Sequence, residues 1–301
     1  MNRLHLATAL KAIIAIVVLA QISHVAHADA PPVPVKHRVL LVAYDHGNSR
    51  LMEVSADGKL EWEHKLPSLT VMFQRLPNGN IVYAHSGTPT GATEIDRDGK
   101  VVWDYKSDAK ELLGCERLPN GNTLLGEGGP CRAVEVNSKG EVVSSINLKS
   151  AAAPHNQVRR LHQLANGHIL VAHEGDSAVR EYDRDGKVVW EYKGVENVFE
   201  AVRLKSGNTL IAGGTQKRLI EVSPEGKIVW ELKADDVPEL NLQWITSLQV
   251  LANGNYVVAN FLRGHEGQGA HAFEITHDKK VVWKFADHAM VKSLTMLQVL
   301  D

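Results

Sequence analysis

Short apolar runs and polar turns alternate along almost the whole chain, and the alternation repeats. One turn sequence, with Asn-Gly or Ser-Gly at its centre, occurs five times, at residues 75–80, 117–122, 163–168, 203–208 and 250–255. An apolar, strand-like run follows each turn, for example Ile81-Val82-Tyr83-Ala84. Asn-Gly between apolar runs is a strong hairpin signal, because both residues of a two-residue turn take positive φ.

A second sequence, Asp-x-Asp-Gly-Lys-Val-Val-Trp or a relative of it, follows one strand later. It is nearly identical at residues 96–106 and 183–193 and recognisable at 55–62, 223–230 and 276–283. Residues 137–143 keep the turn, but the tryptophan after it is missing. A period of about 40 residues is typical of a repeat protein. Each repeat predicts a four-stranded meander with two tight turns, and such units stack radially into a β-propeller.

Counting the repeats predicts six blades in a single domain at residues 37–301. Five are complete, at residues 69–106, 111–149, 157–193, 197–233 and 243–286. Residues 37–65 supply only three strands, and residues 293–300 resemble the first strand of the last complete blade. We therefore expect an all-β six-bladed propeller of four-stranded antiparallel blades, whose C-terminal strand completes the first blade and closes the ring. The tryptophans at the repeated position are expected to pack between blades: Trp62, Trp103, Trp190, Trp230 and Trp283.

The N-terminus indicates export. Residues 1–28 combine Arg3 and Lys11 with an apolar run at 12–20 and a small-x-small cleavage site before Asp29, as a signal peptide does. The apolar run is shorter than the about 20 residues that a membrane helix needs. Residues 29–36 hold three prolines and predict an extended leader. We expect a periplasmic or secreted monomer without a membrane span in its mature form; retention of residues 1–28 as an anchor is the alternative.

The chain contains two cysteines, Cys115 and Cys131. An even pair in an oxidising compartment favours a disulfide over free thiols. The bond would close a loop of about 15 residues and contribute up to ~3 kcal/mol in the chain-entropy model. A nucleophilic cysteine is the less favoured alternative.

Function is expected where the repeats differ, on the face opposite the two kinds of turn. That face carries the ends of the second strands, the starts of the first strands and the loops between blades. The candidate catalytic residues, at the ends of second strands, are His85, Glu127 and His173. The candidate ligand-binding residues are His155, Arg160, His162, Glu200, Trp244, Asn260 and Arg263. Imidazole and carboxylate suit acid–base catalysis, and arginine suits a carboxylate or sulfate.

The first strands contribute a second polar set near the axis. Its members share one register that Val202 interrupts: Gln74, Glu116, His162, Gln249 and Gln298. A pocket at the axis for a small polar or anionic ligand is one interpretation, and a water-filled polar channel is the other. No His-x-His or His-Glu-x-x-His string supports a metal site, and no cofactor is expected. The formal net charge of −2 gives no sign of a nucleic-acid partner.

The repeat resembles those of PQQ-like propellers and of bacterial arylsulfotransferases, and most closely those of exported single-domain propellers of environmental bacteria. The resemblance to quinoproteins implies eight blades and a vicinal cysteine pair, which this chain lacks, so no PQQ is expected. The resemblance to arylsulfotransferases implies a histidine nucleophile with supporting His and Arg, parts that His85, His155, His173 and Arg160 would fill.

Two functions remain open from the sequence. The first is binding of a saccharide or sulfated compound in the axial pocket, with or without His/Glu catalysis. The second is a non-catalytic protein-binding scaffold that uses the insertion at residues 261–271 and the loops at the rim.

Overall fold

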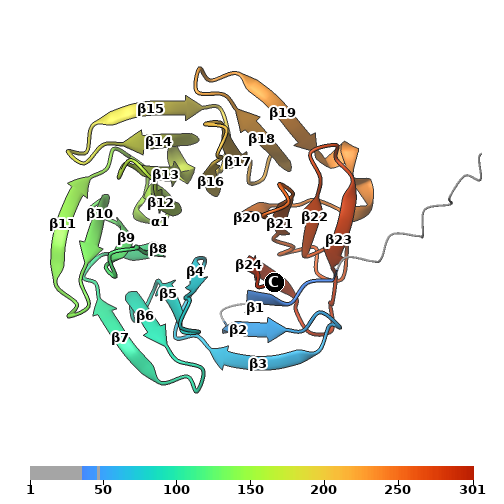
Figure 1. Ribbon diagram of the computed structural model, residues 1–301, viewed down its shortest axis with the longest axis horizontal. Helices are drawn as coiled ribbons and strands as arrows, with labels where there is room; N and C mark the ends of the chain where they lie inside the picture. Colours follow the sequence, from blue (N-terminus) through green and yellow to red (C-terminus); the bar gives the residue numbers. More distant parts are fainter. Residues whose placement is uncertain (1–35, 46–47) are drawn as a thin grey trace, which may run out of the picture. The chain divides into compact units, whose positions relative to one another are not determined.

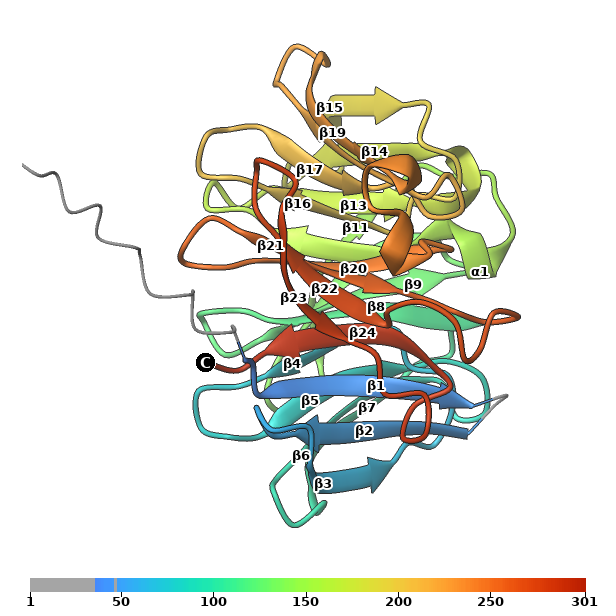
Figure 2. The same cartoon turned by 90° about the vertical axis from the view of Figure 1, so that its right-hand side faces the viewer.

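The computed structural model describes residues 36–45 and 48–301, so the predicted signal peptide lies outside the described residues. The described chain forms six four-stranded antiparallel sheets around a central axis (Figure 1). Seen from the side, the strands run between the two faces of the ring (Figure 2). The predicted fold class, an all-β six-bladed propeller, is confirmed.

In each blade the first strand lies nearest the axis and the fourth forms the outer edge. From the axis outward, blade 1 comprises β24 (Ser293–Val299), β1 (Val39–Asp45), β2 (Asn48–Val54) and β3 (Leu60–Lys65). Blade 2 comprises β4 (Phe73–Arg75), β5 (Ile81–His85), β6 (Gly91–Ile95) and β7 (Val101–Lys106). Blade 3 comprises β8 (Glu111–Arg117), β9 (Thr123–Gly128), β10 (Arg132–Val136) and β11 (Val142–Asn147). Blades 4 to 6 comprise β12 (Arg160–Gln163), β13 (Ile169–His173), β14 (Ala178–Tyr182) and β15 (Val188–Lys193); β16 (Glu200–Arg203), β17 (Thr209–Ala212), β18 (Arg218–Val222) and β19 (Ile228–Lys233); and β20 (Ile245–Val250), β21 (Tyr256–Asn260), β22 (Ala272–Ile275) and β23 (Val281–Phe285).

Helical structure is confined to short connections. These are α1 (Pro154–Gln157) and the 3-10 segments η1 (Glu174–Asp176), η2 (Ala234–Asp236) and η3 (Pro238–Leu240). Throughout residues 36–45 and 48–301, helices fall short of the length and apolar character that a membrane crossing requires.

The C-terminal strand closes the ring as the sequence predicts. β24 is the innermost strand of blade 1 and pairs antiparallel with β1, with Val299 opposite Val39 and Leu297 opposite Leu41. A bulge between Val42 and Ala43 shifts the register before the pairing ends. Pairing the last strand with β1 in one sheet closes the ring between the first and last blades.

The tight turns differ from the expected type. In the first Asn-Gly turn, at residues 76–80, the amide of Leu76 donates to the carbonyl of Asn80, and Gly79 is the turn residue with positive φ, at +89°. The loop is therefore a three-residue turn that ends in a left-handed glycine, instead of the two-residue turn that Asn-Gly alone predicts. The side chain of Asn78 stabilises it by accepting the amide of Asn80 at 3.0 Å.

Hydrophobic clusters fill the spaces between blades, and the repeated tryptophans join them at the turn face. Four of these indoles donate to a backbone carbonyl in the next blade: Trp62 to Arg97, Trp103 to Asn137, Trp190 to Pro224 and Trp230 to His277. The donor–acceptor distances lie between 2.7 and 3.1 Å. For these four, packing between blades is confirmed.

The predicted disulfide is not formed in the structure, where Cys115 and Cys131 are both free thiols. Cys115 packs with Val82 between blades 2 and 3, whereas Cys131 packs with Leu161 between blades 3 and 4. The two side chains leave opposite faces of the same sheet, so they point away from each other. Burial raises the pKa of Cys115 to about 12, which also disfavours a nucleophilic thiolate.

Candidate functional site

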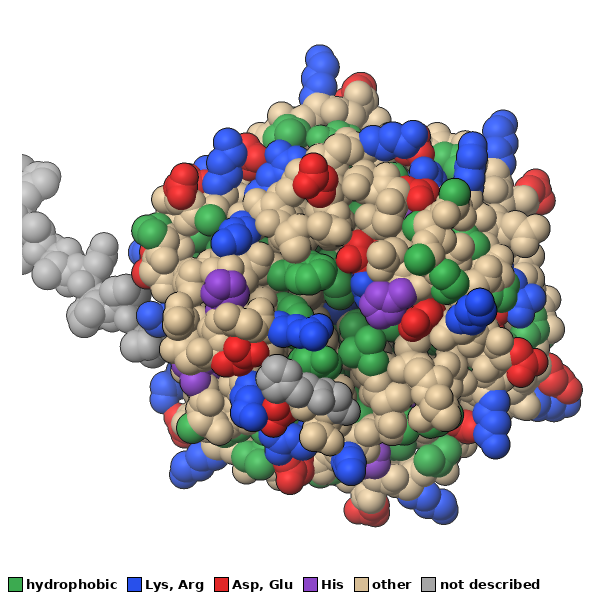
Figure 3. Space-filling view, turned by 180° about the vertical axis from the view of Figure 1, so that it is seen from behind, with side chains coloured by type: hydrophobic (Ala, Val, Ile, Leu, Met, Phe, Trp, Pro, Cys, Tyr) green, Lys and Arg blue, Asp and Glu red, His purple; other side chains and the backbone are tan. Residues whose placement is uncertain are grey.

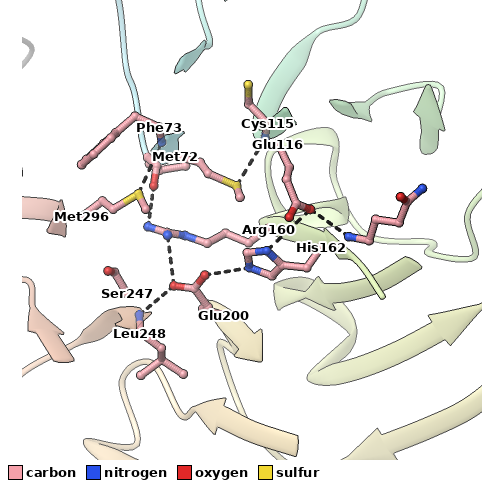
Figure 4. A network of polar contacts seen from close by, with 12 residues as sticks. Met72, Phe73, Cys115, Glu116, Arg160, His162, Glu200, Ser247, Leu248 and Met296 are labelled. Carbon is pink, nitrogen blue, oxygen red and sulfur yellow. Dashed lines mark hydrogen bonds and ion pairs between the residues drawn. The ribbon is translucent and has the colours of Figure 1, made fainter. Parts of the chain in front are cut away.

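A buried ion pair crosses the propeller axis. The side chain of Arg160 starts in blade 4 and pairs with Glu200 of blade 5 at 3.0 Å (Figure 4). It also donates to the carbonyl of Val71, which precedes blade 2, and to that of Thr295 in blade 1 at 3.2 Å. Glu200 in turn accepts the amide of Leu248 in blade 6 at 2.8 Å. One arginine and one carboxylate thus tie five blades together and fill the middle of the channel.

His162 extends this network toward the turn face. Its Nε2 lies 3.0 Å from Glu200, and its Nδ1 lies 3.8 Å from Glu116 of blade 3 (Figure 4). Burial alone would lower the pKa of His162, but the bonds to Glu116 and Glu200 raise it to about 10. Burial would likewise raise the pKa of Glu200, yet Arg160 and His162 hold it below its usual value. The centre of the propeller is therefore an ionised network.

The second polar set forms a ring of bonds between blades. Four of the five members accept a backbone amide of the next blade: Gln298 from Arg75, Gln74 from Arg117, Glu116 from Gln163, and Gln249 from Val299. The fifth, His162, bonds to Glu200 instead. These side chains also line a cavity of about 190 Å³ at the turn end of the axis. Because their oxygens already have partners, we interpret the set as structural.

A second cavity opens at the axis on the opposite face, above Arg160. It has a volume of about 130 Å³, and we call it the aromatic pocket after four of its lining residues: Tyr44, Phe199, Trp244 and Phe261. Figure 3 shows that hydrophobic side chains gather near the middle of this face, among cationic and histidine side chains. An apolar cavity of about 150 Å³ accommodates benzene. The aromatic pocket is slightly smaller than that but open to solvent, so it has room for about one ring at most.

Two polar side chains on the wall of the pocket are held by other residues. The guanidinium of Arg159 pairs with Glu174 and lies over the ring of Phe199, 4.7 Å from its centroid. His155 of α1 has its Nε2 3.2 Å from Arg159 and its Nδ1 3.3 Å from Glu111. The bond from His155 lowers the pKa of Glu111. Both imidazole nitrogens of His155 are therefore engaged.

Three further polar groups on residues that line the pocket make no hydrogen bond or ion pair with the described residues. The indole Nε1 of Trp244 and the hydroxyl of Thr246 are buried without a hydrogen-bond partner in residues 36–45 and 48–301. Arg263 is exposed at the rim, 6.0 Å from the ring centroid of Tyr44, and forms no ion pair within the described part of the chain. Buried donors without partners are rare in proteins and call for an explanation, and a ligand acceptor is one.

Asn260 holds the pocket together from behind. Its buried side chain accepts the amides of Gln243 and Trp244 and donates to the carbonyls of Asn241 and Ala270. All of its capacity goes to the backbone beside Trp244. Asn260 therefore positions the pocket and is not available to a ligand.

The three candidate catalytic residues do not converge, which corrects the expectation from the sequence. His85 bonds to Pro89 and Thr93, and Glu127 bonds to Tyr105 and Arg132 between blades 2 and 3. His173 lies buried against Tyr182, and desolvation lowers its pKa to about 4. The faces of a blade look toward its neighbours, so side chains on second strands enter the spaces between blades and not the channel.

Comparison with known proteins places the chain in a family. The model of the Mal s 1 allergenic protein-like family matches residues 48–261. The chain belongs to this family. No curated protein matches the sequence. The PQQ-like and arylsulfotransferase resemblance therefore stays a prediction beyond the shared propeller.

Solved structures match this Mal s 1-like propeller over most of its length. A protein of unknown function from Bacteroides caccae is 26% identical, with a TM-score of 0.77 over 87% of this chain and 98% of that one. A catalytically inactive virginiamycin B lyase from Staphylococcus aureus, solved with quinupristin, is 11% identical, with a TM-score of 0.57 over 84% and 86%. The WD40 propeller domain of Doa1 is 14% identical, with a TM-score of 0.55 over 73% and 74%. The last two similarities show the fold alone.

The site of this Mal s 1-like chain thus overlaps only partly with its sequence-based prediction. His155, Trp244 and Arg263 line the aromatic pocket, while Arg160, His162 and Glu200 lie below it in the central network. Phe199 and Arg159 also line the pocket but were not predicted as site residues; the signal that could have identified them is their place directly before the first strands of blades 5 and 4. Among residues 36–45 and 48–301, no three His, Cys, Asp or Glu side chains group as metal ligands would.

Proposed function

We propose that this protein binds a small anionic molecule that carries one ring, with the ring in the aromatic pocket and the anionic group at Arg263. The observation that carries the proposal is the combination of a ring-sized apolar pocket with the Nε1 of Trp244 and the guanidinium of Arg263, which lack a hydrogen-bond or ion-pair partner among the described residues. The signal-peptide pattern favours binding in the periplasm or outside the cell.

The chemistry of the lining selects among the ligands that the sequence left open. Arginine holds a carboxylate or sulfate through two parallel hydrogen bonds, and an indole N–H needs an acceptor. The aromatic walls favour the face or edge of a ring. A sulfated or carboxylated ring compound meets these demands better than a plain saccharide, since most of the lining offers no partner to hydroxyl groups.

The proposal is binding without catalysis. A general base needs a free nitrogen or oxygen within hydrogen-bond reach of the ligand. His155 is the imidazole at the pocket, and Arg159 and Glu111 take both of its nitrogens. The insertion that the scaffold alternative invoked contributes Phe261 and Arg263 to the same pocket, so it has a place in ligand binding.

A thermal-shift titration of residues 29–301 tests the proposal, with aryl sulfates, aryl carboxylates, uronates and neutral sugars as ligands. At a concentration of about 100 times Kd, a ligand stabilises the folded state by about 2.7 kcal/mol, or roughly 5 to 11 °C. We expect such a shift from aryl sulfates or aryl carboxylates, and a much smaller one from neutral sugars.

Matched variants locate the binding. Arg263→Gln should weaken binding of the anionic ligand about tenfold or more through loss of a charge-assisted bond. Trp244→Phe keeps a ring but removes the unpartnered N–H. Arg50→Gln is the control, because it removes the same charge from an exposed pair with Glu63. The proposal fails if no anionic ring compound binds, or if Arg263→Gln and Trp244→Phe bind as wild type does.

A further inference from the structure

A larger cleft lies on the turn face, between blades 3 and 4 and remote from the aromatic pocket. Its volume is about 700 Å³. Blade 3 contributes Glu135, Ser144 and Ile146 to its lining, and blade 4 contributes Gln163 and Arg184. This is the one interface whose outer strand lacks the repeated tryptophan, so its composition can be compared with the interfaces that are complete.

Ser144 occupies the tryptophan position. It pairs across the sheet with Glu135, just as Trp103 pairs with Glu94 in blade 2 and Trp190 pairs with Glu181 in blade 4. A serine therefore stands where an indole would pack against the next blade. The missing side chain accounts for an opening at this place.

Two groups that surround the indole in the first interface have counterparts in blade 4. In the first interface, Trp62 donates to the carbonyl of Arg97, and the guanidinium of Arg97 lies 4.9 Å from the centroid of the ring. Arg184 has the same place in its turn as Arg97, lines the cleft and is exposed. The cleft thus offers a carbonyl acceptor and a stacking guanidinium to an aromatic N–H group.

A cation is missing as well as a ring. The glutamate opposite each tryptophan has an Arg or His partner near the next blade: Glu53 with Arg75, Glu94 with Arg117, Glu181 with Arg203, Glu221 with His277, and Glu274 with His37. Glu135 bonds to Asn120 and Asn122 and forms no ion pair in the described part of the chain. Gln163 stands where Arg75, Arg117 and Arg203 stand in other blades, and it is neutral.

We propose that the cleft between blades 3 and 4 binds an arylalkylamine, a ligand that joins an aromatic N–H ring to an ammonium group. The ring takes the place of the absent indole below Arg184, and the ammonium takes the place of the absent arginine beside Glu135. The interface of blades 1 and 2 shows that these charges are compatible, because Arg75 and Arg97 both pair with Glu53 there. This site is separate from the aromatic pocket and prefers ligands of the opposite charge.

Ligand-observed NMR titration of residues 29–301 tests this with tryptamine and indole-3-acetate, which share a ring and differ in charge. We expect tryptamine to bind at least about tenfold more tightly through its charge-assisted bond to Glu135. Glu135→Gln should reduce that preference while it keeps the acceptor for Asn120 and Asn122. Ser144→Trp should abolish tryptamine binding at the cleft by supplying the missing indole.

Ser145→Trp is the matched control for the added bulk, because Ser145 is the next residue of β11 and points from the other face of the strand. Retained binding in Ser145→Trp together with loss in Ser144→Trp supports the proposal. Unchanged tryptamine affinity in Ser144→Trp would overturn it. So would equal affinity for the two probes in the Arg263→Gln variant, which removes the anion partner proposed for the aromatic pocket, or no tryptamine binding to wild type at up to about 10 mM.

Discussion

Replacement of Arg160 by methionine is the most direct test of the central network. The variant Arg160→Met keeps an unbranched side chain of similar length but removes the charge and all donors. Glu200 then loses its ion pair at 3.0 Å, and the carbonyls of Val71 and Thr295 lose a donor in the middle of the molecule. The wild-type Arg160 side chain has no exposed surface, so solvent does not replace these bonds without entering the channel.

The expected loss of stability in Arg160→Met depends on the bonds that Glu200 keeps. Removing one partner of a buried ion pair costs about 3–5 kcal/mol, because the other charge is left uncompensated. Glu200 keeps its bonds to His162 and to the amide of Leu248, so we expect the lower end, about 3 kcal/mol. At 2–4 °C for each kcal/mol, this lowers the melting temperature by roughly 6 to 12 °C.

Differential scanning calorimetry of Arg160→Met, Glu200→Met and the double variant checks this reasoning. If the two side chains stabilise the fold through each other, the double variant loses less than the sum of the single variants by about 1 kcal/mol or more. Arg50→Met is the control, since its exposed pair with Glu63 is worth about 1 kcal/mol at most. A melting temperature of Arg160→Met equal to that of the control, or strictly additive losses, would refute the argument.

Three further predictions concern other buried groups. Burial lowers the pKa of His173 and of His271 to about 4, so the stability that they contribute is present above pH ~6.5 and is lost as the pH falls toward 4. In urea unfolding, His173→Gln should lose less stability than wild type over this pH range. An equal loss of stability in the two proteins would contradict the prediction. Cys115 and Cys131 should react with Ellman's reagent only after unfolding, and two thiols should then titrate; failure of both to titrate without reductant would indicate the disulfide. Asn260→Ala should destabilise the fold by about 1–3 kcal/mol in urea unfolding and weaken ligand binding at the aromatic pocket, and wild-type values for both would exclude its positioning role.

The repeat made the fold predictable because local and long-range signals coincide in it. The turn glycines, the apolar runs and the period all indicate the same four-stranded blade, and the resemblance of residues 293–300 to a first strand indicates ring closure. The type of turn was harder to predict from the sequence than the blade itself. Asn-Gly signals a hairpin, but the number of residues between the last paired positions decides its geometry, and Leu76 pairs with Asn80 across three residues.

The candidate site was harder to predict, because the sequence gives the order of residues along a strand but not the direction of each side chain relative to the axis. His85 and His173 end second strands at the correct face, yet their side chains enter the interfaces between blades. Arg160 and Glu200 belong to first strands, and these do meet at the axis. Whether a side chain reaches the axis therefore depends more on which strand of the blade carries it than on its position along that strand.

Departures from the repeat separate into two kinds when the neighbouring bonds are compared. Val202 interrupts the ring of polar side chains, but Glu200 two residues earlier supplies the link to blade 6 by accepting the amide of Leu248 at 2.8 Å. Ser144 interrupts the series of tryptophans, and the cleft beside it remains open at about 700 Å³. Within the described part of the chain, Glu135 has no cationic partner like those of its counterparts. Where a neighbouring residue restores the missing hydrogen bond, as Glu200 does beside Val202, the departure from the repeat has a structural explanation. A binding site requires a departure that leaves the positions of a ring, a donor and a charge unfilled together. Of the departures at Val202 and at Ser144, only the one at Ser144 does so, and the blade 3–4 cleft is therefore the candidate binding site.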